Sequence, residues 1–328
     1  MTATDNARVA AITTGLDRLK RSLRVGGRTT APYDHPEPRW ETRFVQNLSG
    51  RRPTTTRLAD FGYRDHELPG RPGLPDDLAM AGPVRLLTDD GARALRDICR
   101  ALKPRAVRDD HGVPHRLRDV ESLSPFVHAM VRDAVFLDTV SRLVGVPLVP
   151  HPLRDAGVQT YYYGPPAPSE ARTGAAWHLD GMNYVFTMTL SDRADHDGGA
   201  HLYFKGHPDD FDAHREDITR RGPAHPRVHK APFLHVGDTM FTRGSRVYHA
   251  VTPVTRGERV TLAVSLFCPL LGGQDENRFW HSAPDDGLLR TLRNWNRLRR
   301  AVHRPAHYCR REEIPIVPLS GVFPRQEG

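Results

Sequence analysis

Four pairs in the sequence place a histidine two residues before an acid, a spacing at which both side chains can bind one metal ion. They are His35 and Glu37, His178 and Asp180, His207 and Asp209, and His214 and Glu216. The chain contains 18 histidines, so any single pair carries little information. Three of the pairs lie in a proline-rich segment or in a polar helical stretch. Only His178 and Asp180 lie between two segments with strand patterns.

In an extended segment, residues i and i+2 point to the same face, so His178 and Asp180 can both face the inside of a barrel. A third ligand is available downstream, because His249 lies in the strand pattern of residues 246–251. Two imidazoles and one carboxylate on one side of a metal leave adjacent positions open, as in the non-haem Fe(II) oxygenases. Three protein ligands with an open position also suit catalytic zinc, so the three residues alone do not fix the metal.

Arg259 follows His249 after a short turn-forming segment. Residues 255–258 include Gly257 and predict a tight turn, which would fold the strand that begins at Arg259 back beside the His249 strand. The guanidinium would then point into the same cavity, where its planar fork suits bidentate binding of a carboxylate. A cavity with Fe(II) and one buried arginine matches 2-oxoglutarate, whose keto acid end chelates the metal and whose C5 carboxylate needs a cation. The alternative is a surface arginine on a strand.

Residues from about 158 to 267 resemble the Fe(II)/2-oxoglutarate-dependent dioxygenase superfamily, in particular its prolyl-hydroxylase-like members and the bacterial amino-acid hydroxylases. The matching segments are Tyr161–Gly164, His178–Asp180, Thr187–Leu190, Gly198–Leu202, Gly237–Phe241 and His249–Arg259. The resemblance implies a double-stranded β-helix (jelly-roll) core, with His178, Asp180 and His249 as iron ligands and Arg259 on the C5 carboxylate of 2-oxoglutarate. It also implies that the protein uses Fe(II), 2-oxoglutarate and O2.

Further site residues follow from the same resemblance, since a hydroxyl or amide on a neighbouring strand often assists the arginine. We expect three residues beside 2-oxoglutarate, namely Tyr163, Thr187 and Thr189. Four residues are candidates for substrate binding, namely Tyr161, Trp177, Asn183 and Arg243. Trp177 flanks a metal ligand, and strand alternation would place Arg243 on the same face as His249.

The expected reaction is hydroxylation of an unactivated C–H bond. Related halogenases replace the carboxylate ligand by a small residue, and Asp180 is present here, although desaturation and ring closure remain open. The expected substrate is a small molecule, an amino acid or an amino-acid-derived metabolite. The alternatives are a protein or peptide side-chain hydroxylase, a nucleic-acid-directed oxygenase, and a metal-binding barrel without catalysis. Arg259 argues against the last, because simple metal binding has no need of a carboxylate fork.

These side chains must be positioned by a mainly β structure with helical flanks. Helices are expected over 5–23, 88–102, 123–144, 208–221 and 285–303. Strands are expected over 158–163, 184–190, 200–204, 228–234, 238–242, 246–251 and 259–267, which predicts a sandwich or barrel. We therefore expect a helical and irregular region (1–155) packed on the catalytic core (156–270), with a helical flank (271–328). The three parts form one catalytic unit.

The composition narrows the possible partners and surroundings. Lys and Arg total 47 against 39 acidic residues, a net charge of +8, but the acids are interleaved with the arginines along the chain. The arginine-rich tail has few aromatic residues on which bases could stack, so nucleic acid is not an expected partner. Three dispersed cysteines argue against a disulfide scaffold. The sequence has no apolar run of about 18 residues, so we expect no membrane span. The cytoplasm is the expected location. The sequence leaves the oligomeric state open.

Overall fold

The computed structural model describes residues 35–48, 53–68, 76–108, 115–165, 174–275 and 288–315. The helix expected over 5–23 lies outside these ranges. No helix in the described ranges is both long and apolar enough to span a membrane.

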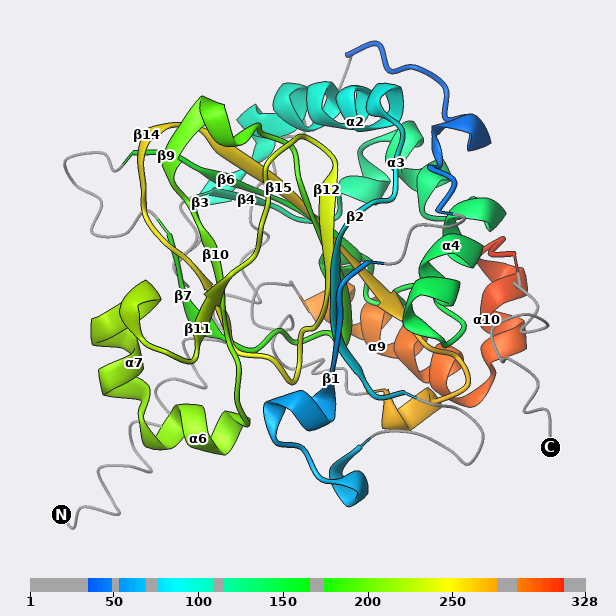
Figure 1. Cartoon of the computed structure of the whole chain (residues 1–328). Coiled ribbons are helices and arrows are strands. Elements are labelled where there is room, and N and C mark those ends of the chain that lie inside the picture. Colours follow the sequence, from blue (N-terminus) through cyan, green and yellow to red (C-terminus); the bar gives the residue numbers. More distant parts are fainter. Residues whose placement is uncertain are drawn as a thin grey trace, which may run out of the picture.

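The strands form two main sheets (Figure 1). The larger sheet has the order β1 (Thr55–Arg57), β2 (Leu78–Arg85), β12 (Asp238–Arg243), β8 (Tyr184–Thr189), β15 (Arg259–Phe267), β6 (Val158–Tyr163), β4 (His115–Leu117) and β3 (Val107–Arg108), with β5 (Val149–Pro150) also on β15. The smaller sheet has the order β11 (Val228–Lys230), β10 (His201–Phe204), β13 (His249–Val251) and β7 (Ala175–His178). A separate pair consists of β9 (His196–Gly198) and β14 (Val254–Gly257).

From β6 onward the chain passes repeatedly from one sheet to the other. The central order β12-β8-β15-β6 in the larger sheet is matched by β11-β10-β13-β7 in the smaller one. Apolar side chains from both sheets pack together between them, among them Tyr163, Ala175 and Val251. This strand order is that of a double-stranded β-helix. The predicted fold class, mainly β with helical flanks around a jelly-roll core, is confirmed.

Helices cover the outer face of the larger sheet. They are α2 (Asp89–Leu102), α3 (Pro125–Met130) and α4 (Ala134–Val144). Leu95 and Phe126 from these helices belong to the main core, together with Phe186 and Leu262 of the sheet. The helix predicted over 123–144 is two helices, because the Asp133 carboxylate accepts the backbone N–H groups of Val135 and Phe136 and begins a new helix there.

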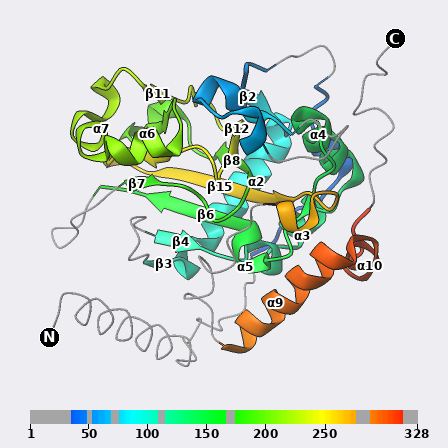
Figure 2. The ribbon, with the colours of Figure 1, turned by 90° about the horizontal axis from the view of Figure 1, so that it is seen from below.

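Other helices flank the sheets on opposite sides (Figures 1 and 2). Helices α6 (Pro208–Ala213) and α7 (Arg215–Arg221) replace the single helix predicted over 208–221, since His214 between them has a non-helical backbone. Phe211 of α6 packs on the outer face of the smaller sheet. At the other side lie α5 (Arg154–Gly157), α9 (Leu288–His303) and α10 (Pro305–Arg311). Leu298 of α9 packs against Met182, next to the segment that carries Asp180.

Three expectations about strands are corrected by the structure. The region 1–155, expected to be helical and irregular, contributes β2, which pairs with β12 in the larger sheet. The strand expected over 246–251 begins only at His249, because residues 244–247 form the turn between β12 and β13. Strand β15 pairs with β6 and β8 and not with the His249 strand. The chain turns at Gly257 as predicted, but it crosses to the opposite sheet.

Candidate active site

The three predicted metal ligands meet inside the barrel. One nitrogen of His178, one of His249 and a carboxylate oxygen of Asp180 all lie within 4.8 Å of one another. The two histidines are direct partners in the β7–β13 pair, with ring centroids 4.3 Å apart. The Oδ1 atom of Asp180 lies 3.4 Å from the Nε2 atom of each ring. Residues from two strands and the loop after β7 thus form one cluster.

Hydrogen bonds to the backbone fix the orientation of both imidazoles. The Nδ1 atom of His178 lies 2.8 Å from the carbonyl oxygen of Ala176, and that of His249 lies 2.9 Å from the carbonyl oxygen of Val247. A carbonyl oxygen only accepts, so each Nδ1 carries the proton and each Nε2 lone pair is left for a metal. Two such nitrogens and one carboxylate make the ligand set of a 2-His-1-carboxylate centre.

The electrostatics of the cluster suit a cation. Burial by itself raises the pKa of Asp180, but His249 and His178 beside it lower the pKa by more than burial raises it. The carboxyl is therefore ionised at neutral pH. Burial lowers the pKa of His249, and the Asp180 carboxylate more than offsets this, so the pKa is raised overall. A metal ion would supply the positive charge that Asp180 attracts.

The Asp180 loop is held by the turn between β12 and β13. The backbone N–H of Asp180 donates to the carbonyl oxygen of Gly244 at 2.7 Å, and the N–H of Gly244 donates to that of Asn183 at 2.9 Å. A Cβ atom on Gly244 would lie 2.6 Å from Oδ2 of Asp180 and 2.6 Å from the carbonyl oxygen of Met182. Only glycine therefore fits behind the carboxylate ligand.

Arg259 lies on the inner face of the larger sheet. It is the first residue of β15 and is 2% exposed. Its direct partner on β6 is Tyr163, and the guanidinium carbon lies 5.1 Å from the centre of the phenol ring. Both terminal nitrogens are buried and donate no hydrogen bond to any of the described residues. Burial lowers the pKa of Arg259, and Tyr163 opposes that shift. A buried cation without an acid is costly, so this pocket suits an anion.

Gly199 makes room for the arginine. Gly199 follows β9 with a φ of +64°, and a Cβ atom there would lie 2.7 Å from Cδ of Arg259. The segment Gly198–Leu202, which carries part of the sequence resemblance, thus packs directly along the arginine stem. A larger residue at position 199 would displace Arg259.

The other residues expected near 2-oxoglutarate share this inner face. Thr261 of β15 is paired with Tyr161 on one side and with Thr189 on the other. Ala263, the next residue of β15 on the same face, is paired with Thr187. The Thr189 hydroxyl donates to the carbonyl oxygen of Ser191 at 3.0 Å, so its proton is already used. Thr187 is half-buried. The rings of Tyr161 and Tyr163 stack with centroids 6.5 Å apart.

Arg243 and Asn183 do not face the cavity. Arg243 and Asp76 form an ion pair in which both side chains are 0% exposed, with Nη1 2.9 Å from Oδ2 of Asp76. Asn183 donates to Asp275 at 3.0 Å and accepts from Ser245 at 3.1 Å. The predicted substrate-binding role is therefore not supported for either. Alternation along the chain does not carry through the turn at 244–247, which is why Arg243 and His249 differ in orientation.

Trp177 also points away from the metal cluster. It precedes His178 on β7 and so takes the opposite face of the strand. Its ring lies 5.3 Å from that of Phe211, beneath the α6–α7 insert. Trp177 is thus part of the packing outside the smaller sheet and does not wall the pocket.

The sequence reasoning assigned no role to His201, a third imidazole at the site. It lies on β10, is 5% exposed, and stacks on His249 with centroids 5.6 Å apart and ring planes 17° apart. Its Nε2 atom is buried without a partner in the described ranges. Burial, His249 and Arg259 hold the pKa of His201 well below its usual range, so the ring is neutral. Its place in the segment Gly198–Leu202 was the available signal, but only the pairing of β10 with β13 reveals the contact.

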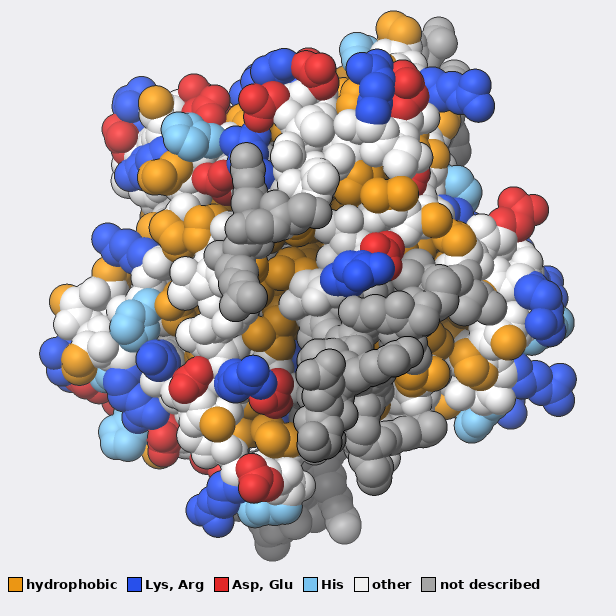
Figure 3. Space-filling view, turned by 45° about the vertical axis from the view of Figure 1, so that its right-hand side comes forward, with side chains coloured by type: hydrophobic (Ala, Val, Ile, Leu, Met, Phe, Trp, Pro, Cys, Tyr) orange, Lys and Arg blue, Asp and Glu red, His pale blue; other side chains and the backbone are white. Residues whose placement is uncertain are grey.

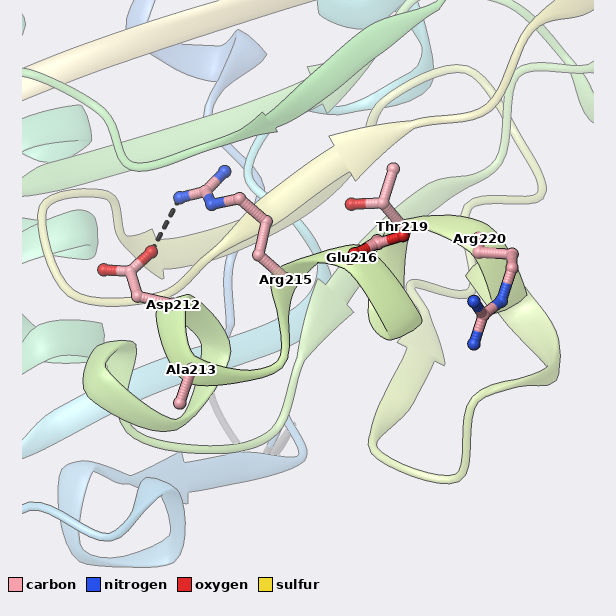
Figure 4. A pocket seen from close by; sticks show the side chains of 6 residues that line it. All are labelled: Asp212, Ala213, Arg215, Glu216, Thr219 and Arg220. Carbon is pink, nitrogen blue, oxygen red and sulfur yellow. Dashed lines mark hydrogen bonds and ion pairs between the residues drawn. The ribbon is translucent and has the colours of Figure 1, made fainter.

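A separate hollow of about 590 Å³ lies between α6 and α7 (Figure 4). It is lined by Asp212, Ala213, Arg215, Glu216, Thr219 and Arg220. Arg215 donates to the Asp212 carboxylate at 2.7 Å and to the Tyr248 hydroxyl at 2.8 Å, so its guanidinium is already paired with an acid. The hollow belongs to the insert on the outer side of the smaller sheet and contains no part of the metal cluster.

Comparison with known proteins gives matches among solved structures alone. No family model and no curated protein matches the chain. HygX from Streptomyces hygroscopicus with nickel and 2-oxoglutarate bound is 14% identical, with a TM-score of 0.41 over 57% of this chain and 81% of that one. A Pseudomonas putida prolyl-4-hydroxylase is 16% identical, with a TM-score of 0.39 over 57% and 91%. The non-heme monooxygenase ThoJ, as its nickel complex, is 16% identical, with a TM-score of 0.40 over 68% and 96%.

The fold assignment itself depends on the strand order of this chain.

Proposed function

We propose that the protein is an Fe(II)- and 2-oxoglutarate-dependent oxygenase that hydroxylates a C–H bond of a small molecule. One observation carries the proposal: the metal cluster and the unpartnered guanidinium of Arg259 both face the inside of the same barrel. A metal with open positions and a buried cation nearby are the two groups that a chelating dicarboxylate requires.

The residues present fit both components. The cluster of two imidazoles and one carboxylate suits iron, although it also suits zinc. Arg259 discriminates between these readings, because a zinc hydrolase or a simple metal-binding protein needs no buried guanidinium without an acid. The two orphaned nitrogens of Arg259 match the two oxygens of a carboxylate. This match supports 2-oxoglutarate over a cosubstrate that chelates the metal but has no second carboxylate.

Each residue then has a distinct task. When bound, Fe(II), 2-oxoglutarate and O2 supply the oxidising chemistry, in which 2-oxoglutarate loses CO2 and one oxygen atom enters the substrate. His178, Asp180 and His249 would hold the metal. Arg259 and Tyr163 orient the distal carboxylate. Apolar side chains packed between the sheets keep water from the pocket.

The metal cluster is most open on the side of His178. The His178 side chain is 44% exposed, Asp180 25% and His249 9%. His178 lies on β7, the edge strand of the smaller sheet. We infer that the substrate approaches across this edge.

The proposed substrate is an amino acid or an amino-acid-derived metabolite. The narrower sequence resemblance supports this choice, while Arg243 is excluded as its carboxylate-binding group because it is paired with Asp76. Hydroxylation of a peptide side chain is the second candidate. The opening at the β7 edge is compatible with either, so turnover must decide between them.

A nucleic-acid substrate is less favoured by the surface charges. Basic and acidic side chains are mixed on the face shown in Figure 3. Several surface arginines pair with nearby acids, including Arg93 with Asp90, Arg227 with Asp210 and Arg256 with Asp197. Such pairing weakens the field that would attract a phosphate backbone.

The proposal is tested by 2-oxoglutarate turnover. The protein is loaded with Fe(II) without oxygen and then mixed with oxygen, 2-oxoglutarate and a panel of free amino acids, their derivatives and short peptides. We expect succinate formation to rise several-fold with one class of small molecule. Stimulation by peptides alone would favour the second candidate. Absence of 2-oxoglutarate binding to the metal-loaded protein would reject the oxygenase proposal.

A further inference from the structure

His201 has the features of a recognition group that the metal cluster does not explain. Its ring lies on the inner face of the smaller sheet, because its partner in the β10–β13 pair is Val251, two residues after His249. Val251 packs with Tyr163 and Val254 in the space between the sheets. The His201 side chain therefore borders the same cavity as Arg259.

The ring is held in place by its neighbours on two sides. His249 stacks nearly parallel to it at 5.6 Å, and the ring of Phe233 meets it edge-on, with centroids 5.7 Å apart and planes 80° apart. Neither contact uses the ring nitrogens. A side chain packed in this way is preorganised, so it loses little freedom when it binds a ligand.

The Nε2 atom is nevertheless left without a partner. It is buried, and no acceptor or donor in the described ranges lies within hydrogen-bonding distance of it. Buried polar atoms are bonded in the great majority of cases, and an unmade hydrogen bond there costs stability. In a protein that keeps such an atom beside a binding cavity, a ligand is a natural partner.

The position of His201 indicates what kind of ligand this is. The ring stacks on the metal ligand His249, and Gly199, two residues before His201, packs against Cδ of Arg259. His201 is therefore close to the groups proposed to hold the two ends of the cosubstrate. An imidazole with its proton on Nε2 can donate to an oxygen that only accepts, such as a carboxylate.

We propose that His201 is a second recognition group for 2-oxoglutarate, whose Nε2–H donates a hydrogen bond to a carboxylate oxygen of the bound cosubstrate. The inference rests on the proposed function, because it takes 2-oxoglutarate as the occupant of the cavity. It adds a neutral donor to the charged fork of Arg259. His201 thereby selects for an anionic oxygen at a place where an apolar residue would only contact the hydrocarbon chain.

The test measures binding and does not depend on turnover. Nickel replaces iron so that no reaction occurs, and calorimetry gives the dissociation constants of nickel and of 2-oxoglutarate separately. The variants are His201→Leu, which removes the donor, and His201→Gln, whose amide nitrogen can replace Nε2. His151→Leu is the matched control, since His151 is 2% exposed but has its Nδ1 bonded to the N–H of Leu153 at 3.1 Å.

We expect His201→Leu to raise the Kd for 2-oxoglutarate by about 10- to 100-fold, the range for a hydrogen bond to a charged group. The Kd for nickel should stay unchanged, and the melting temperature of the metal-free protein should not fall, because the lost nitrogen had no partner. His201→Gln should recover much of the affinity. His151→Leu should lower the melting temperature and leave both dissociation constants unchanged.

Two results would overturn the inference. One is a His201→Leu variant that binds 2-oxoglutarate as tightly as the parent protein. The other is an equal loss of nickel and 2-oxoglutarate affinity, which would assign His201 to the support of His249. If the parent protein with nickel binds no 2-oxoglutarate at all, the proposed function fails instead, and the variants need not be compared.

Discussion

Asp180 and Gly244 are joined by a backbone hydrogen bond of 2.7 Å, which ties the loop of the carboxylate ligand to the turn between β12 and β13. The carboxylate then lies directly above a residue that has no side chain. The position of the metal ligand is thus set by backbone contacts that link β7 to β12.

Gly244→Ala is predicted to weaken metal binding. The added Cβ atom would lie 2.6 Å from Oδ2 of Asp180, so the loop must shift and the three ligands lose their common centre. We expect the Kd for nickel, measured by calorimetry, to rise at least about 10-fold, or about 1.4 kcal/mol. Gly164→Ala is the control, because a Cβ atom there meets nothing within 4 Å. Equal nickel affinity in the two variants would show that the loop tolerates the shift.

Asp180→Ala and His249→Ala are predicted to abolish 2-oxoglutarate turnover. Each removes one of three ligands and leaves the metal with two. Succinate production should fall to the background of the metal-free protein, and nickel binding should fall with it. Circular dichroism should show an intact fold. Full turnover in either variant would refute the metal assignment.

Arg259→Ala is predicted to separate cosubstrate binding from metal binding. Loss of the guanidinium should raise the Kd for 2-oxoglutarate by about 100-fold or more, equivalent to about 3 kcal/mol, because the distal carboxylate loses a charge-assisted bond pair. The Kd for nickel should not change. Arg256→Ala, on exposed β14 three residues earlier, should leave both values unaltered.

The same Arg259→Ala variant should be no less stable than the parent protein without ligand. An unpaired buried charge opposes folding, so its removal should leave the melting temperature unchanged or raise it. A marked fall in melting temperature would mean that Arg259 has a structural partner, and the anion-pocket reading would lose its main support.

Asp133→Asn is predicted to destabilise the fold in a pH-dependent way. The Asp133 carboxylate caps α4 and accepts from Trp40 at 3.1 Å, and although burial raises its pKa, bonds from Thr42 and Trp40 lower it overall. At neutral pH we expect a loss of about 0.5–2 kcal/mol in the free energy of unfolding, because Asn has a single accepting oxygen and its NH2 group would face the donors of Trp40 and Thr42. Because the folded pKa is lowered, this contribution is present above the unfolded pKa of about 4 and is lost as the pH falls through the folded value.

Urea titrations at neutral and acidic pH check this prediction. The difference between parent and Asp133→Asn should shrink at the acidic end. Asp138→Asn is the control on the same helix, where an exposed pair with Arg142 should contribute less than about 1 kcal/mol. A difference that does not depend on pH would assign the cost to packing and not to the carboxylate charge.

The buried pair of Arg243 and Asp76 is predicted to be strongly coupled. Removing one partner leaves the other charge buried and unpaired, so Arg243→Met and Asp76→Asn should each cost about 3–5 kcal/mol. The double variant should cost clearly less than the sum of the two. A double-mutant cycle from urea unfolding measures this coupling. Additive losses would show that the two side chains act independently.

The sequence was sufficient to predict that His178, Asp180 and His249 come together and that Arg259 is buried. His178 and Asp180 are two residues apart on a short extended segment, so local geometry already places them together. The spacing from His249 to Arg259 is part of the resemblance that identified both residues. The boundaries of β6 and β15 agree with the predicted strands, because both are short segments rich in β-branched and aromatic residues.

The missed features all depend on contacts between distant segments. The face taken by Arg243 follows from the turn at 244–247, which strand alternation cannot describe. The contact of His201 with His249 requires the register of β10 against β13, and no local pattern encodes it. The participation of β2 depends on its pairing with β12, far away in the sequence.

The place of Asp76 sets a lower limit on how far this protein could be shortened. The carboxylate that neutralises Arg243 comes from the segment before β2, well outside the region 156–270 that contains the ligands. A gene trimmed to that region would encode a barrel in which Arg243 is buried without its acid and β12 is an exposed edge strand. The barrel of this chain therefore cannot be moved into another protein without Asp76 and β2, and any shortened version must keep both.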